Sequence, residues 1–190
     1  MAILAGSIRA EFQRSWTVRA EFELCLPEVK GAYGKTMDLS DLITPYGVIP
    51  ALKAANKKQA LQELSLRASK LTGIDEHEIF NTLLQRERLG STGVGNGIAI
   101  PHGKINALKH IVGLFARLEE PIEFDAIDEE PVDLVFLLLA PEDAGADHLK
   151  ALARISRLMR EPAAVEKLRS SRDKEALYAV LTEPAASHAA

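Results

Sequence analysis

A run of seven consecutive apolar residues, Leu134 to Ala140, limits what this chain can fold into. The run is far shorter than the roughly 20 residues that a membrane-spanning helix needs. Pro131 and Pro141 bound the longer stretch 132–140, which predicts a β-strand that is buried on both faces. Because such a strand must be covered on each side, the chain should contain a central sheet between two layers of helices.

The rest of the pattern supports a layered arrangement. Two further apolar runs, 98–100 and 111–118, predict strands that end near prolines. Apolar residues at helical spacing predict five helices, at 56–73, 75–90, 146–159, 163–170 and 173–182. Asn56 is a good N-cap for the first helix and Gly73 is placed to end it. We therefore predict an α/β fold, a single layered domain whose central mixed β-sheet is flanked by helices on both faces.

The first 36 residues differ in composition from the rest of the chain. They contain the only tryptophan, Trp16, and the only cysteine, Cys25, but none of the five histidines. Glycine and proline interrupt any periodicity there. We expect 1–36 to be a flexible N-terminal extension or a result of start-site choice, with Met37 as an alternative start. The domain is then expected at 37–182, followed by a frayed tail at 183–190.

Charge and cysteine content exclude several classes of function. A net charge of -4 argues against nucleic-acid binding as the main role, because that role needs a basic face. A single cysteine excludes an intramolecular disulfide framework and a multi-cysteine zinc site, and it fits a reducing compartment. The opening residues lack the basic and apolar regions of a secretory signal. We expect a cytoplasmic protein with no membrane insertion and no nucleic-acid partner.

The densest chemical signal is a glycine-rich segment before a histidine. A Walker-type loop needs four residues before its Gly-Lys pair, whereas five separate Gly97 from Gly103 here. The dinucleotide-binding pattern needs a glycine where Ile98 stands. A backbone without side chains can still direct its N–H groups toward an anion. The residues that we expect to bind phosphate are Ser91, Thr92, Gly93, Gly95, Asn96 and Gly97.

His102 directly follows an apolar strand and Pro101, and it precedes Gly103. Proline should end the strand pairing, and the glycine should leave one side of the imidazole uncrowded. A neutral imidazole is a competent nucleophile toward a phosphoryl group, whose transfer needs mainly positioning and hydrogen-bond donors. Arg86 and Arg88 are donors nearby in the sequence. From the residues alone, a structural histidine beside a turn remains an equal alternative.

The segment from Glu87 to Gly103 resembles the phosphohistidine signature of the fructose/mannitol-type enzyme IIA domains of the phosphoenolpyruvate-dependent phosphotransferase system. Six residues separate Glu87 from Val94-Gly95, and two more precede the run Ile98 to Gly103. The segments 124–128 and 131–134 indicate the nitrogen-related branch, enzyme IIA-Ntr, and the resemblance covers about 37–182. It implies a phosphotransferase that works as a phosphocarrier, with an HPr-like donor protein and no cofactor.

The resemblance also implies the roles of three residues. His102 would form the tele-phosphohistidine intermediate, on the ring nitrogen remote from the backbone, and Arg86 would help to neutralise the phosphoryl group. His148 would be the second active-site histidine, and its place near a helix start independently favours negative charge nearby. Arg86 and Arg88 are two residues apart on a helix, so they point to different faces. Arg88 is therefore assigned to a rim that binds the partner.

Three functions are compared. The first is a regulator of nitrogen, potassium and carbon metabolism that acts through its phosphorylation state on targets such as potassium transporters or sensor kinases. The second is a sugar-specific IIA component that passes phosphate to a IIB domain. The third is a metal-dependent hydrolase built on His102 and His148. It would need a third ligand, and the sequence does not place Asp147 or Asp128 there, so we expect no metal. His77 is expected to be solvated, and no role is assigned to His110 or His188.

Overall fold

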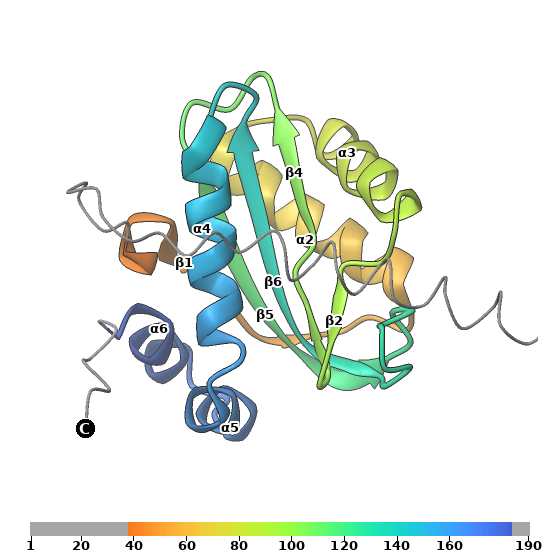
Figure 1. Cartoon of the computed structure of the whole chain (residues 1–190), viewed down its shortest axis with the longest axis vertical. Helices are drawn as coiled ribbons and strands as arrows, with labels where there is room; N and C mark the ends of the chain where they lie inside the picture. Colours follow the sequence, from red (N-terminus) through yellow and green to blue (C-terminus); the bar gives the residue numbers. More distant parts are fainter. Residues whose placement is uncertain (1–37, 184–190) are drawn as a thin grey trace, which may run out of the picture. The chain divides into compact units, whose positions relative to one another are not determined.

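The computed structural model describes residues 38–183, which form a mixed six-stranded sheet with helices on both faces (Figure 1). The predicted α/β class and its layered arrangement are confirmed. The expectations for 1–37 and 184–190 lie outside the described residues.

The sheet is built around one long strand. The strands are β1 Ile43–Leu52, β2 Gly93–Gly95, β3 Ile98–Ala99, β4 His102–Ile105, β5 Val112–Ile122 and β6 Val132–Pro141. Their order is β1-β5-β6-β3-β2, and β4 also pairs with β6. β1 is parallel to β5, β5 is antiparallel to β6, and both β3 and β4 are parallel to β6. Every residue of β6 except Asp133 is buried, which confirms the prediction for this run.

The five predicted helices are present, with ends within two residues of the expected positions. They are α2 Lys57–Thr72, α3 Glu76–Arg88, α4 Gly145–Leu158, α5 Pro162–Ser170 and α6 Lys174–Thr182, after a short 3-10 turn, η1 Leu39–Asp41. Asn56 caps α2 by accepting a hydrogen bond from the Gln59 amide at 3.0 Å. Gly73 ends it with a φ of 74°, which favours glycine. Asp75 caps α3.

The structure corrects two expectations about strands. β1 was not predicted, because Pro45 and Pro50 interrupt it; both are tolerated because β1 is an edge strand of the sheet. Pro101 was expected to end strand pairing, but the pairing with β6 resumes at His102. β3 and β4 keep one register against β6, in which Ile98 pairs with Leu134 and His102 pairs with Leu138. They therefore form one strand with a break at 100–101.

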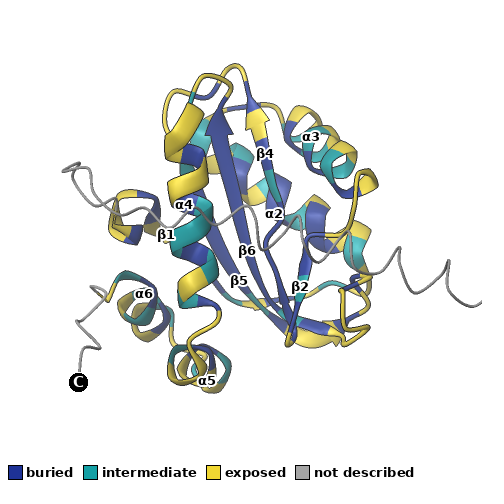
Figure 2. Cartoon of the chain, viewed as in Figure 1, coloured by how far each residue is buried: buried dark blue, intermediate teal, exposed yellow. Residues whose placement is uncertain are grey.

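Alternate side chains of β6 build two apolar cores, one on each face of the sheet. Val135, Leu137 and Leu139 belong to the core that contains apolar residues of α2 and α3. Leu134, Phe136 and Leu138 belong to the core that contains residues of α4, α5 and α6. Figure 2 shows β6 buried along its length between these layers. Burying each such side chain contributes roughly 1.5–3 kcal/mol, so the sheet fixes where α3 and α4 lie.

Candidate functional site

His102 lies at the break between β3 and β4, and the break determines the state of its ring. Pro101 has no amide hydrogen, while its carbonyl accepts a hydrogen bond from the Leu138 amide at 2.9 Å. The carbonyl of Ile100 lies 2.8 Å from Nδ1 of His102. Since a carbonyl oxygen can only accept, Nδ1 holds the ring proton. In the neutral imidazole, Nε2 then has the free lone pair.

Helix α3 brings Arg86 to that nitrogen. A Cβ atom at Gly103 would lie 2.7 Å from Cγ2 of Thr82, so only glycine allows α3 to pack this close to β4. Gly103 therefore admits the helix, in addition to any room that it leaves beside the imidazole. Arg86, one turn after Thr82, donates from Nε to Nε2 of His102 at 3.1 Å. Its Nη1 donates to the carbonyl of Gly90 at 3.0 Å.

His148 reaches the same place from α4, on the other face of the sheet. Its ring centroid is 5.8 Å from that of His102, and the residue is 7% exposed. Its Nδ1 is buried and has no hydrogen-bond partner among residues 38–183. Burial lowers the pKa of His148 to about 4, with smaller contributions from the charges of His102 and Lys104. His148 is therefore neutral at neutral pH.

His102 is also more easily deprotonated than a free histidine. Burial is the main cause that lowers its pKa, and the Arg86 guanidinium lowers it further. The Ile100 carbonyl and the Glu87 carboxylate oppose this shift. The net lowering keeps the ring neutral, and hence nucleophilic, near neutral pH.

A surface pocket of about 630 Å³ surrounds these side chains. It is lined by Thr82, Gln85, Arg86, Arg88, Leu89, His102, Gly103, Lys104 and His148. Three of these residues are cationic and none is acidic, so the pocket suits an anion. Arg88, predicted as a rim residue, lines the pocket and is exposed.

The first half of the glycine-rich segment faces other partners. The Ser91 hydroxyl donates to the carbonyl of Phe124 at 2.8 Å, and it accepts from the Gly93 amide at 3.1 Å. The amide of Thr92 donates to the Glu87 carboxylate at 3.1 Å, and its buried hydroxyl is bonded to the same group. These groups have protein partners in this structure, and their contact with phosphate stays a prediction.

The second half of the glycine-rich segment lies farther from His102. Gly97 accepts hydrogen bonds from the first residues of β6, whereas His102 pairs with Leu138, so about 13 Å of strand separates the two levels. The Asn96 amide donates to the Asp128 carboxylate at 2.7 Å. Gly95 has a φ of 94°, and a Cβ there would lie 2.9 Å from Asp128. These glycines therefore admit neighbouring side chains, and their binding of phosphate stays a prediction.

Sequence reasoning missed several residues near the site. It left Glu87, a member of the recognised segment, without a role, and it did not mention Lys57, which forms an ion pair with it at 2.7 Å. Lys104 and Leu89 in the pocket lining were missed too. Lys57 stands 30 residues before Glu87, and no local pattern indicates their contact.

The remaining histidines lie elsewhere. His77 and His110 are exposed, and neither lines the pocket; His188 is outside the described residues. Within residues 38–183, no group of three or more histidine, cysteine or acidic side chains is placed to hold a metal ion. No helix in that range is long and apolar enough to cross a membrane.

Comparison with known proteins agrees with this arrangement. Residues 41–183 match the family described as phosphoenolpyruvate-dependent sugar phosphotransferase system, EIIA 2. A nitrogen regulatory protein of Bradyrhizobium diazoefficiens is 60% identical over 153 residues, covering 80% of this chain and 100% of that protein. A fructose-specific EIIA component of the phosphotransferase system of Haloferax volcanii is 37% identical over 151 residues. The match covers 77% of this chain and 98% of that protein.

A solved structure extends the similarity to three dimensions. The crystal structure of nitrogen regulatory protein IIA-Ntr from Neisseria meningitidis matches with a TM-score of 0.73 at 33% identity. The match covers 76% of this chain and 99% of that chain. The chain therefore belongs to the EIIA type 2 family of the phosphoenolpyruvate-dependent sugar phosphotransferase system, and it is similar to nitrogen regulatory members of that family.

Proposed function

We propose that this phosphotransferase-system protein accepts a phosphoryl group on Nε2 of His102 from a phosphorylated HPr-like donor protein. One observation supports this most strongly: the hydrogen bond of 2.8 Å from Nδ1 to the Ile100 carbonyl leaves Nε2 without a proton, so its lone pair can attack phosphorus once the Arg86 N–H turns away. The surrounding cations supply what phosphoryl transfer needs besides a nucleophile, which is positioning and charge stabilisation.

The proposed step conserves atoms and charge. The Nε2 lone pair of His102 forms a new N–P bond as the N–P bond of the donor's phosphohistidine breaks. The electron pair of the broken bond returns to the donor imidazole. The His102 ring becomes more positive when Nε2 is bonded to phosphorus, and the Ile100 carbonyl stabilises that charge through Nδ1–H. The reverse step passes the group on to an acceptor.

Arg86 and His148 contribute in different ways. The Arg86 Nε–H now directed at Nε2 can turn to an oxygen of the arriving phosphoryl group, while Nη1 stays on Gly90. His148, neutral and 5.8 Å away between ring centroids, can donate one N–H to the same group. Both roles depend on donors that are already in place.

The donor protein would dock on the apolar and basic surface around the pocket. Leu89 is 85% exposed, and Leu149, which follows His148 on α4, is 57% exposed. Large apolar side chains beside a reactive group are typical of a docking surface. Arg88 adds a positive charge to this rim, so the donor should present apolar residues with acidic neighbours.

The downstream role is proposed from the relatives. The name nitrogen regulatory protein, given to relatives such as that of Bradyrhizobium diazoefficiens, supports a role in nitrogen regulation. Our proposal extends this role to potassium and carbon metabolism, through the phosphorylation state of the protein, with potassium transporters or sensor kinases as the proposed targets. A carrier charged from phosphoenolpyruvate would act in the cytoplasm. The fructose-specific relative of Haloferax volcanii supports the second candidate, a IIA component that passes phosphate to a IIB domain.

Labelling with phosphoenolpyruvate and the two upstream phosphotransferase proteins tests the proposal. We expect acid-labile phosphate on the wild-type chain and none on His102→Ala, and ³¹P NMR should place the phosphorus on Nε2. Labelling of His102→Ala at the wild-type rate would refute the assignment. Adding sugar-specific IIB proteins distinguishes the candidates, because rapid loss of label to a IIB would favour the sugar-specific role.

A further inference from the structure

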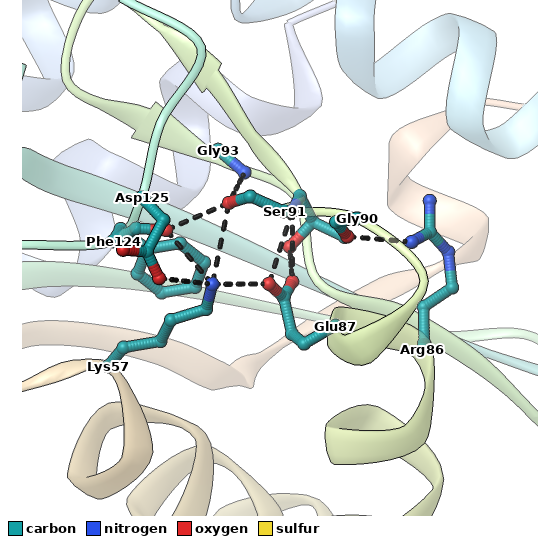
Figure 3. Close-up of polar contacts among 9 residues, drawn as sticks. Lys57, Arg86, Glu87, Gly90, Ser91, Gly93, Phe124 and Asp125 are labelled. Atoms are coloured by element: carbon teal, nitrogen blue, oxygen red, sulfur yellow. Dashed lines mark hydrogen bonds and ion pairs between the residues drawn. The ribbon is translucent and has the colours of Figure 1, made fainter. Parts of the chain in front are cut away.

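We propose that Glu87, neutralised by Lys57, is a positioning residue that sets the hydrogen-bond partners of both ring nitrogens of His102. This inference rests on the proposed phosphoacceptor role of His102 and adds two residues to it. Figure 3 shows the Glu87 carboxylate between Lys57 and the start of the glycine-rich segment, with Arg86 reaching Gly90 beside it.

The Glu87 carboxylate is buried, and its side chain is only 4% exposed. It accepts from the Thr92 amide at 3.1 and 3.3 Å and is hydrogen-bonded to the Thr92 hydroxyl. Through these contacts, the carboxylate near the end of α3 holds Thr92, the residue just before β2, close to the helix. Glu87 therefore determines where residues 90–92 lie.

One branch of contacts runs from this point to Nδ1 of His102. The Thr92 carbonyl accepts a hydrogen bond from the Ile100 amide at 2.9 Å. The Ile100 carbonyl in turn accepts from Nδ1 of His102 at 2.8 Å. The place of Thr92 thus sets the place of the carbonyl that fixes the ring proton.

A second branch runs to Nε2. The Gly90 amide donates to the backbone carbonyl of Glu87 at 3.2 Å, and the Gly90 carbonyl accepts from Nη1 of Arg86 at 3.0 Å. Nε of the same guanidinium donates to Nε2 of His102 at 3.1 Å. Both series of hydrogen bonds start from residues 90–92, which Glu87 positions, and both reach a ring nitrogen of His102.

Lys57, the first residue of α2, is the ion-pair partner of the buried Glu87 carboxylate. Its Nζ lies 2.7 Å from the Glu87 carboxylate and donates to the Phe124 carbonyl at 3.0 Å. It also lies 4.8 Å from the centroid of the Phe124 ring. Asp125 is a second carboxylate on the same ammonium at 3.2 Å, but its side chain is 85% exposed. Of these two carboxylates, Glu87 is the one that continues to the His102 contacts, and Lys57 also donates to the Ser91 hydroxyl at 3.5 Å.

The test combines a rate with a measurement on the ring itself. We expect Glu87→Gln to slow labelling of His102 roughly tenfold to hundredfold, because small displacements of reacting groups have effects of this size. The ¹⁵N NMR spectrum of the unphosphorylated ring should show the Nδ1–H form in the wild type and a larger share of the Nε2–H form in the variant. Asp125→Asn removes the exposed carboxylate and should leave both readouts near the wild type.

Two further variants separate positioning from folding. The double variant Lys57→Met/Glu87→Gln replaces the buried ion pair with neutral groups, a change that proteins often tolerate. It should fold, as thermal melting will show, and yet stay slow. Thr92→Val removes the hydroxyl at nearly constant volume and should slow labelling, while Thr92→Ser should restore it. If Glu87→Gln does not fold, comparison of Thr92→Val with Thr92→Ser tests the positioning role instead.

The inference is overturned if the double variant recovers the wild-type rate, or if labelling slows while the tautomer ratio of His102 stays unchanged. Failure of the proposed function has a different signature. In that case the wild-type chain takes no label at all, whereas the tautomer ratio of the unphosphorylated variants still tests whether Glu87 positions the ring.

Discussion

Replacing His148 should make the folded protein markedly less sensitive to acid. His148 is neutral and buried in the folded state, with a pKa of about 4, whereas an unfolded histidine has a pKa near 6.5. Between these values the unfolded chain binds a proton that the folded chain does not bind. Stability from this group is therefore complete above about pH 6.5 and is lost as the pH falls toward 4.

The two pKa values set the size of the effect. A difference of about 2.5 pK units corresponds to at most about 3.4 kcal/mol. Integrating the linkage relation between about pH 7.5 and 4.5 gives a loss of about 2.5 kcal/mol from His148 alone. Groups that do not interact with His148 contribute equally to the wild type and to a variant that lacks this imidazole, and the charge of His102 makes only a smaller contribution to the pKa of His148.

Urea unfolding of the full chain at the two pH values measures the loss for each variant. We expect His148→Asn to lose about 2.5 kcal/mol less than the wild type between the two pH values. Leu149→Asn, the same substitution at the exposed neighbouring position, should show the wild-type loss. If His148→Asn lost as much stability as the wild type, the assignment of a buried neutral imidazole would be refuted.

Four further outcomes follow from the structure. Gly103→Ala should destabilise the fold by about 1–3 kcal/mol and slow labelling, because its Cβ would meet Thr82, and a second change, Thr82→Ser, should reverse both effects. Leu89→Ser should raise the donor concentration needed for labelling without lowering the melting temperature. Phosphorylation of His102 should raise the pKa of His148 above about 4 in an NMR titration, since a nearby negative charge favours imidazolium. Asn56→Ala should cost about 1 kcal/mol in urea unfolding through loss of the α2 cap.

The elements that the sequence predicted well depend on local chemistry. The helix ends are set by contacts within four residues: Asn56 and Asp75 accept hydrogen bonds from free amides of the first turn, and Gly73 ends α2. Such short-range contacts can be predicted from the sequence. β1 depends on pairing with β5, whose residues lie more than 60 positions later. Two prolines within β1 conceal it further, because only its place at the sheet edge makes them acceptable.

The same distinction explains the site. The structure brings together His102, Arg86 and His148, which the recognised segment and a helix start had indicated. For the glycines at 93–97, phosphate binding stays a prediction, because a missing side chain does not reveal what occupies the space. At Gly95 it is Asp128, and at Gly97 a Cβ would meet Arg169 and Asp133, so these positions serve packing and turn formation.

Pro101, where strand pairing was wrongly predicted to end, lies next to the residues that contact the His102 ring. At the break, the Pro101 carbonyl accepts from the Leu138 amide of β6, and the Ile100 carbonyl lies 2.8 Å from Nδ1 of His102. The register with β6 is the same on both sides of the break, so the proline changes hydrogen bonding without displacing the strand. The edge position of β4 leaves α3 and α4 free to reach the ring from opposite faces. In the proposed function, the strand break and the helices on both faces therefore act together to place His102 with an unprotonated Nε2 between Arg86 and His148.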